Sequence, residues 1–335
     1  MTLVLTLLTA RYVLQVSDRL VTETASCRPF DPLANKNVIY HARDAIVSIG
    51  YSGLAYLEGV PTDQWIAQKL RGEDSFFQSP KRWNVKMARA TRWLDIGQSV
   101  ELLRQECQTV FSRPTADVQP QEIIVAGWQW SRGRTRPIAW WIGNTGDPPD
   151  LHTFHAENLP RHWQWARQKE QPDSRPYNLL GIPSSNPSKP LTERERGELG
   201  KRVASATWSP TTSEQELINA IRLAARRPPH VVGPHCMCIL LPPPSRRSVL
   251  VRYAPLAETR AVVSMGHIKA DVPVAFSPWV VGFHTVVAPS IVAGSRPISV
   301  DDFAVLLEAP DLPPGTGLLS WFGSQPRPPD PRHRT

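Results

Sequence analysis

The sequence has few cysteines, and their spacing limits the metal sites that the chain could form. Only 4 of its 335 residues are cysteines, and they are not spaced like the ligands of a zinc site. Cys27 and Cys107 stand alone. Cys236 and Cys238 are two positions apart, which on a strand puts both on one face, as core residues. The adjacent His235 keeps a metal site open as the less favoured alternative. We therefore expect no metal and no cofactor.

Long apolar runs are also missing. No stretch approaches the roughly 20 apolar residues that a membrane-spanning helix needs. The apolar segment from Leu3 to Ala10 is similar to the hydrophobic part of a secretory signal. However, no basic residues precede it, two threonines interrupt it and Arg11 ends it. The sequence therefore predicts a cytoplasmic protein that does not bind a membrane.

Acidic residues are fewer than basic ones, 30 against 38, which gives a formal net charge of +8. A positive charge permits binding to nucleic acid or to acidic substrates. The basic residues are nevertheless scattered along the chain, and no nucleic-acid-binding motif is present. A nucleic-acid-associated protein is therefore the least favoured of the functions considered.

The second residue is a candidate nucleophile. Initiator methionine is generally removed when a small residue follows, and removal of Met1 would make Thr2 the N-terminal residue. A hydroxyl nucleophile needs a base beside it, and the α-amine of the same residue is one that requires no second side chain. The usual pKa of that amine, about 7.7 to 8.0, suits proton transfer near neutral pH.

Two charged residues are expected beside Thr2. Residues 1–19 read as two β-rich runs with a tight polar connection, and an antiparallel hairpin would return Asp18 to Thr2. Strands predicted over residues 37–40 and 45–50 place Lys36 at a strand start. There its ammonium group would lower the pKa of the Thr2 hydroxyl, and Asp18 would keep it charged.

Each of these residues also has a plain structural interpretation. Thr2 could be the first residue of an edge strand, since threonine is a common strand former. Asp18 and Arg19 could form a solvated turn that contributes little stability, and Lys36 could be a surface lysine. The catalytic interpretation rests on their joint occurrence.

Together with the turn Ser52-Gly53-Leu54-Ala55, which we expect to open a helix, this segment resembles the N-terminus of the proteasome β-subunit group of N-terminal-nucleophile (Ntn) hydrolases, in an uncharacterised bacterial-type branch. The resemblance implies a threonine amidohydrolase or peptidase with a peptide or amide substrate. Thr2 would form the acyl-enzyme, and the Gly53 N–H would bind the oxyanion. The resemblance also implies a homo-oligomer.

The order of predicted elements agrees with the four-layer αββα sandwich of that family, an α+β fold in which helices cover packed sheets. One predicted helix, residues 213–226, begins with Ser213 as N-cap and Glu216 three residues later, the pattern of a capping box. The other predicted helices cover residues 61–70, 99–111 and 192–207, and the later strands cover residues 122–130, 137–143, 235–241 and 248–253.

The sequence departs from the family pattern near the amine of the nucleophile. The gap between Asp18 and Lys36 is slightly longer than usual, and Arg19, a possible supporting residue, follows the aspartate directly. The Asp and Ser that support the amine in the family are absent, because residues 227–233 read Arg-Pro-Pro-His-Val-Val-Gly. Weak replacements are Ser184, Ser185 and His230, of which the histidine is more simply a loop residue. A catalytically inactive Ntn-fold binding or assembly subunit therefore stays open as an alternative.

The length fits one Ntn hydrolase-like domain over residues 1–310 with an insertion at about 144–190. The insertion contains Trp163 and Trp165 and the histidines His152, His155 and His162. It could line a substrate entrance or bind a partner, but a loop held by its own buried tryptophans is favoured. A Pro/Arg-rich tail over residues 322–335 is expected to be disordered.

Overall fold

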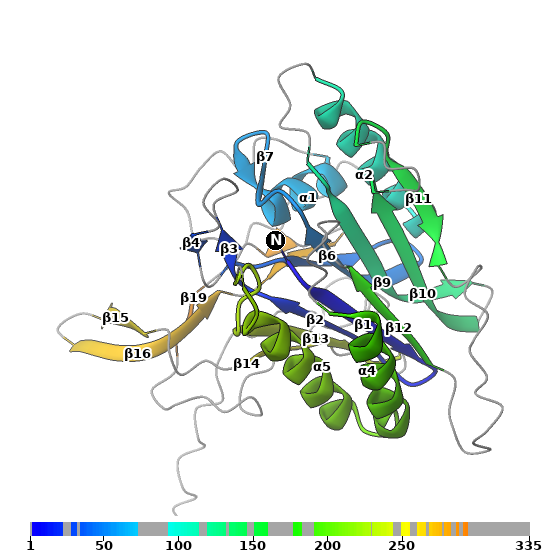
Figure 1. Cartoon of the computed structure of the whole chain (residues 1–335). Coiled ribbons are helices and arrows are strands. Elements are labelled where there is room, and N and C mark those ends of the chain that lie inside the picture. The colour runs from blue at the N-terminus through cyan, green and yellow to red at the C-terminus, as the bar shows by residue number, and fades with distance from the viewer. Residues whose placement is uncertain are drawn as a thin grey trace, which may run out of the picture.

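The chain folds as a mixed α/β protein, in which several β-sheets are accompanied by four helices within the described residues (Figure 1). The structure is a computed structural model. It describes residues 2–22, 28–31, 34–72, 93–113, 119–131, 134–145, 151–159, 177–182, 191–228, 230–243, 249–254, 260–265, 268–276, 278–282, 286–287 and 291–293.

The N-terminal hairpin lies in the middle of a five-stranded sheet with the order β12-β1-β2-β13-β14. Its strands β1 (Val4–Thr9) and β2 (Val13–Asp18) pair antiparallel, as the sequence predicts, and every residue in them is buried. Thr9 closes the turn, because its N–H and its hydroxyl both donate to the Tyr12 carbonyl. The other strands are β12 (Tyr177–Ile182), β13 (Cys236–Leu241) and β14 (Leu250–Ala254). This hairpin brings Asp18 back to the start of the chain.

A second sheet has seven strands in the order β11-β10-β9-β6-β5-β17-β18. Strand β6 pairs antiparallel with β5 on one side and with β9 on the other, in a register that sets Ser52 opposite Glu122. Its strands are β5 (Asn37–His41), β6 (Ala45–Ser52), β9 (Glu122–Ser131), β10 (Arg134–Gly143), β11 (His155–Asn158), β17 (Trp279–Val281) and β18 (Val286–Val287).

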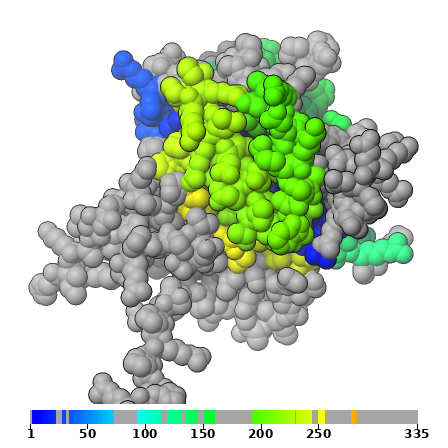
Figure 2. All heavy atoms as spheres, turned by 60° about the horizontal axis from the view of Figure 1, so that its bottom comes forward, coloured from blue at the N-terminus to red at the C-terminus, as the bar shows by residue number. Residues whose placement is uncertain are grey.

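Three apolar clusters hold the sheets and helices together. One packs α1 (Thr62–Arg71) and α2 (Ile96–Phe111) on the second sheet, with residues such as Trp65, Phe111 and Val125. Another packs α4 (Glu193–Ala206) and α5 (Pro210–Ala225) on the first sheet, with residues such as Leu7 and Leu217. Figure 2 shows α4 and α5 in green on the outside of that face. The third cluster lies between the two sheets and draws residues from both.

A short hairpin follows each of the two strands, β2 and β6, whose last residues lie near Thr2. Strands β3 (Val21–Thr22) and β4 (Pro29–Asp31) come after β2, and β7 (Tyr56–Leu57) and β8 (Val60–Pro61) come after β6. In Figure 1 the N-terminus lies between these hairpins. A separate three-stranded sheet is formed by β15 (Arg260–Met265), β16 (Ile268–Phe276) and β19 (Ile291–Ala293).

Three expectations about local structure were wrong. The turn Ser52 to Ala55 does not open a helix, because the β7–β8 hairpin comes first and α1 begins only at Thr62. Helix α2 begins at Ile96, three residues earlier than expected, because Asp95 caps it. Ser213 is not an N-cap: α5 begins at Pro210 after Ser209, whose side chain accepts from the Thr212 N–H. Proline is favoured at the first helical position, where a missing N–H costs nothing.

Several other expectations concern residues outside the described part of the chain: Ser184, Ser185, Trp163, Trp165, His162, Cys27 and the tail at 322–335. The domain limits at 1–310 therefore stay a prediction. None of the described helices is both long and apolar enough to cross a membrane. Cys236 and Cys238 are buried in the cluster between the first sheet and its helices, as expected for core residues.

Candidate active site

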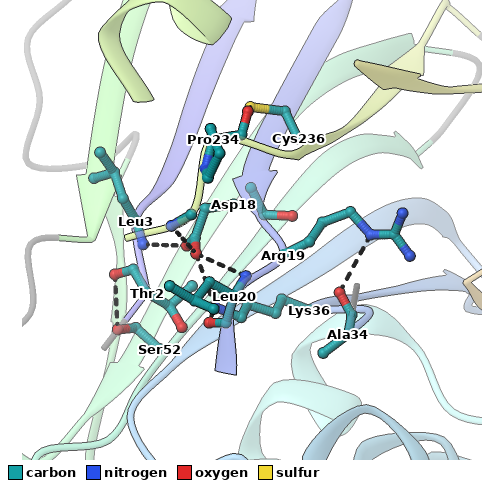
Figure 3. A network of polar contacts seen from close by, with 12 residues as sticks. Thr2, Leu3, Asp18, Arg19, Leu20, Ala34, Lys36, Ser52, Pro234 and Cys236 are labelled. Atoms are coloured by element: carbon teal, nitrogen blue, oxygen red, sulfur yellow. Dashed lines mark hydrogen bonds and ion pairs between the residues drawn. The ribbon is translucent and has the colours of Figure 1, made fainter. Parts of the chain in front are cut away.

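Thr2 lies two residues before β1, next to Ser52 at the end of β6 (Figure 3). Its side chain is almost fully buried, with 3% of the residue exposed. The Ser52 hydroxyl donates to the Thr2 carbonyl oxygen at 3.1 Å, which ties the first strand of one sheet to β6 of the other. Within the described residues the Thr2 hydroxyl itself makes no hydrogen bond.

Asp18, the last residue of β2, receives several hydrogen bonds. Its Oδ1 accepts from the Leu3 N–H at 2.8 Å, and its Oδ2 accepts from the Leu20 and Gly233 N–H groups, each at 3.1 Å. Lys36 donates to the same Oδ2 (Figure 3). Asp18 is fully buried. The carboxylate therefore fixes the backbone of the residue after Thr2, of Leu20 after β2 and of the loop before β13.

Lys36 forms a buried ion pair with Asp18. The Nζ to Oδ2 distance is 3.1 Å, and Nζ also donates to the Leu20 carbonyl. Burial lowers the pKa of Lys36, while the negative charge of Asp18 opposes that shift. An ammonium group has three N–H donors, and within the described residues only two of them have acceptors. One donor has no acceptor among these residues.

The structure contains one link of the chain of contacts expected from the sequence, the contact between Lys36 and Asp18, and adds a bond that was not expected, from Leu3 to Asp18. Lys36 contacts Asp18 directly, and Asp18 is bonded to Leu3, the residue that follows Thr2. A hydrogen bond between the Thr2 hydroxyl and Lys36 is not formed among these residues. Met1, which precedes Thr2 in the chain, lies outside the described part.

Gly53 follows β6 directly and has a backbone conformation that only glycine adopts easily. Its φ is +120°, and an added Cβ would lie 2.4 Å from both the Pro120 carbonyl oxygen and Gln121 Oε1. The Gly53 N–H donates to no acceptor within the described part of the chain. An oxyanion is the acceptor that the resemblance seen in the sequence implies for this donor.

The other suggested supporting residues lie elsewhere. The Arg19 guanidinium packs over the Tyr253 ring, 4.9 Å from its centroid, and its Nε donates to the Ala34 carbonyl. Burial lowers the pKa of Arg19. His230 is exposed and lies beside the end of α5, with Nδ1 3.2 Å from the Ala225 carbonyl oxygen. It has the loop position that the plainer interpretation gives it.

Sequence reasoning missed the residues that act through their backbones. Gly233 donates its N–H to Asp18, and an added Cβ there would lie 2.6 Å from the Leu20 Cβ. The only signal was a glycine just before a strand. Within the described residues no group of three or more His, Cys, Asp or Glu side chains could hold a metal ion.

No family model matches the chain, and no curated protein matches it. Among solved structures, Anbu (ancestral β-subunit) from Yersinia bercovieri is 12% identical over 72% of this chain and 82% of that chain, with a TM-score of 0.40. Anbu from Hyphomicrobium sp. strain MC1 is 11% identical with the same coverage and a TM-score of 0.41. A helical assembly of the Anbu complex from Pseudomonas aeruginosa is 11% identical over 72% of this chain and 81% of that chain, with a TM-score of 0.38.

These comparisons correct the family assignment made from the sequence. The assignment to a bacterial-type branch of the proteasome β-subunit-like Ntn hydrolases is wrong as stated, because no family model matches and the structures found are Anbu proteins with TM-scores of 0.38 to 0.41. Such a weak likeness does not supply another family. The matches at Thr2, Asp18, Lys36 and Gly53 involve too few residues to define one.

Proposed function

We propose that the chain is a threonine hydrolase that cleaves an amide or peptide bond through an acyl-enzyme on Thr2. The observation that carries the proposal is the buried Lys36–Asp18 pair, which is hydrogen-bonded to the residue after Thr2 and, within the described residues, keeps one ammonium donor without an acceptor. Buried charged pairs beside a hydroxyl nucleophile are a recognised way of activating it.

The reaction requires Met1 to be removed. The freed α-amine of Thr2, or Lys36, takes the proton from the Thr2 hydroxyl as Oγ attacks the carbonyl carbon of the substrate. The negative charge that develops on the carbonyl oxygen is stabilised by the Gly53 N–H. The C–N bond then breaks, and the leaving amine takes up the proton. Water attacks the resulting ester, releases the acid and restores the Thr2 hydroxyl.

The proposed fold is an αββα sandwich of four layers. Two observations support it: a buried cluster lies between the two large sheets, and a separate helix pair packs on each of them. In this arrangement Thr2, Lys36 and Gly53 come from different strands but belong to one end of the sandwich. We further propose a homo-oligomer, an expectation that the resemblance of the N-terminal segment implies.

A second function is favoured by a separate observation. The Asp18 carboxylate accepts from three backbone N–H groups in addition to Lys36. These bonds would stabilise the fold even in a chain with no catalytic activity. In that alternative the pair is purely structural, and the protein serves as a binding or assembly subunit.

One experiment separates the two functions. The full chain is produced with an excess of methionine aminopeptidase, and mass spectrometry establishes whether Thr2 is N-terminal. The protein is then incubated with a β-lactone, an electrophile that acylates hydroxyl nucleophiles as its ring opens. We expect one added acyl group, located on Thr2 by peptide mapping.

Two variants serve as matched controls. Thr2→Ala should lose the acyl group and any amide hydrolysis, whereas Thr2→Ser, which keeps a hydroxyl on the N-terminal residue, should retain both. Retained Met1 or an unmodified Thr2 in correctly processed protein would instead support the non-catalytic alternative.

A further inference from the structure

The turn that carries Gly53 is held by hydrogen bonds to the peptide groups on either side of Leu54. The Leu54 N–H donates to Gln121 Oε1 at 2.7 Å, and the Leu54 carbonyl oxygen accepts from the Thr62 hydroxyl, also at 2.7 Å. The Thr62 N–H donates to the Ala55 carbonyl oxygen at 2.9 Å. Two distant segments, the start of β9 and the start of α1, therefore converge on residues 54 and 55.

Both side chains that hold the turn are themselves fixed. Thr62 is fully buried and is the first residue of α1. The residue before it, Pro61, makes no side-chain capping bond, so the helix start is anchored to the turn through Thr62. Gln121 is also fully buried, and its N–H donates to Asn144 Oδ1 at 2.7 Å. Asn144 in turn donates to the Gln119 and Leu151 carbonyls.

The side-chain amide of Gln121 is unfavourable at a position that serves only to fill the interior. Its orientation follows from the contact with the Leu54 N–H, which requires an oxygen. Its Nε2 is buried and has no hydrogen-bond partner within the described residues. An unpaired buried donor is unfavourable, so an apolar residue would pack better here unless the Oε1 contact with Leu54 matters.

The direction of the Gly53 N–H depends on this turn. Gly53 has a φ of +120°, a region where glycine has little intrinsic preference and where neighbouring contacts decide the conformation. An oxyanion donor must point at the developing charge to within a few tenths of an ångström, and mobility of the donor reduces its contribution.

We propose that Thr62 and Gln121 are positioning residues, which clamp the Leu54 peptide and so aim the Gly53 N–H at the carbonyl oxygen of the substrate. This inference rests on the proposed function of Thr2. Neither residue is assigned a contact with substrate, and each acts through Leu54.

The first test compares two variants at one position. Thr62→Val keeps the shape of the side chain and removes the hydroxyl, whereas Thr62→Ser keeps the hydroxyl. We expect Thr62→Val to lower the rate constant of Thr2 acylation by the β-lactone about tenfold or more, and Thr62→Ser to stay within about threefold of the unchanged chain. The β-lactone concentration at half-saturation should change less than the rate constant in both variants.

Gln121→Leu, which removes the Oε1 acceptor, should lower the acylation rate constant in the same way as Thr62→Val. Equal acylation rate constants in folded Thr62→Val, Thr62→Ser and unchanged protein would overturn the proposal. A change in the half-saturating β-lactone concentration with no change in the acylation rate constant would also overturn the proposal.

A second measurement needs no activity and keeps the inference separable from the proposed function. With ¹⁵N-leucine labelling, the amide signal of Leu54, whose N–H donates to Gln121 Oε1, can be assigned by its loss in Leu54→Met. We expect hydrogen exchange at this amide to quicken in Thr62→Val and not in Thr62→Ser. If Thr2 is never acylated but exchange quickens only in Thr62→Val, the proposed function is wrong and the positioning role of Thr62 is still supported. Unchanged exchange in Thr62→Val removes the clamp. If Thr62→Val does not fold, Gln121→Leu is measured in its place.

Discussion

Two carboxyl groups, those of Asp18 and Asp63, are buried near the candidate site. Within the described residues, only Asp18 of the two forms an ion pair. Asp18 is bonded to Lys36 and to three backbone N–H groups. Asp63, in the first turn of α1, is nearly as buried, and burial raises its pKa to about 7. Backbone N–H groups of residues 63 and 64 oppose that shift but do not cancel it. Asp63 is thus expected to carry a proton at mildly acidic pH.

Asp63 should make the stability of the fold depend on pH. Its pKa is about 7 in the folded chain against an ordinary 3.8, so between these values the folded chain holds a proton that the unfolded chain releases. The contribution is fully present below pH 3.8 and is lost as pH rises through 7. We expect it to amount to at most about 4 kcal/mol of unfolding free energy. Urea unfolding from pH 4 to pH 8 measures it.

The control for this prediction is the variant Asp63→Asn, which cannot ionise. Its unfolding free energy should fall less with rising pH than that of the unchanged chain. Glu198→Gln, at an exposed helix position, should follow the unchanged chain. Parallel curves for Asp63→Asn and the unchanged chain would contradict the prediction.

At the scale of elements, the helices of this chain begin in different ways. Helix α2 has a capping box: the Asp95 side chain accepts from the Gln98 N–H, and the Gln98 side chain accepts from the Asp95 N–H. Helix α5 begins with Ser209 and Pro210, and α1 has no side-chain cap at Pro61. The stability of these helix starts should therefore respond to different substitutions.

Removal of the cap of α2 should destabilise the fold measurably. Asp95→Ala loses the acceptor for the Gln98 N–H, and we expect it to lower the unfolding free energy by about 1 kcal/mol, within a usual range of about 0.5 to 2. Asp95→Asn keeps an acceptor and should lose much less, although both variants lose the exposed ion pair with Arg43, which contributes little. Urea unfolding compares them. Equal losses would assign the effect to the ion pair.

Local pattern predicted most of the long elements but not all of their ends. The N-terminal hairpin could be predicted because short apolar runs flank a polar turn. The Ser213 and Glu216 pattern was misleading, because residues three apart lie on one face anywhere in a helix. In the fold, Ser213 is buried and bonds to Tyr12 and Ala206, while Glu216 pairs with Arg202. Strands β15 to β19 were not expected at all.

Only those parts of the candidate site that consist of side chains could be predicted from the sequence. Asp18 and Lys36 could be paired from strand ends and chemistry. Gly233 and Leu20 could not, because they contribute backbone groups, whose donors and acceptors are the same in every residue type except proline. Gln121 reaches the Gly53 turn from a segment far away in the sequence, through the pairing of β9 with β6. Thr62 reaches it through the β7–β8 hairpin.

At the scale of the whole molecule, the two large sheets are joined by polar contacts as well as by their apolar cluster. Gln15 on β2 accepts at Oε1 from Asn37 on β5 and from Ser48 on β6, each at 2.6 Å. Its Nε2 donates to the Thr6 hydroxyl on β1 at 3.0 Å, and Ser17 donates to Asn37. These five residues, which we call the polar seam, are fully buried.

The polar seam lies next to the candidate site along both strands. Ser17 precedes Asp18, and Asn37 follows Lys36, so the seam connects the residues adjacent to the ion pair. It also explains the small residue at position 50, where an added Cβ would lie 3.0 Å from Asn37 Nδ2 and 2.9 Å from Val4 Cγ1. Close approach of the sheets at this point therefore depends on the seam. The homo-oligomer and the cytoplasmic location stay predictions from the sequence.

The residues of the polar seam should act as a unit in stability measurements. Gln15→Leu leaves the Asn37 amide and the Ser48 hydroxyl without their acceptor, and an unsatisfied buried group costs about 1 to 3 kcal/mol. Asn37→Leu leaves the Ser17 hydroxyl without its acceptor, whereas Gln15 Oε1 still accepts from Ser48. The double variant removes both partners together, so its loss of unfolding free energy should fall short of the sum of the single losses by about 0.5 to 3 kcal/mol.

A double-mutant cycle by urea unfolding measures this coupling. Val4→Ala, placed in the apolar cluster between the sheets, serves as the reference for a core substitution outside the seam. If the Gln15 and Asn37 losses add to within about 0.5 kcal/mol, the usual limit for independent sites, the two amides contribute separately. The sheets would then be positioned by their apolar cluster, and the seam would have no part in placing Asp18 opposite Lys36.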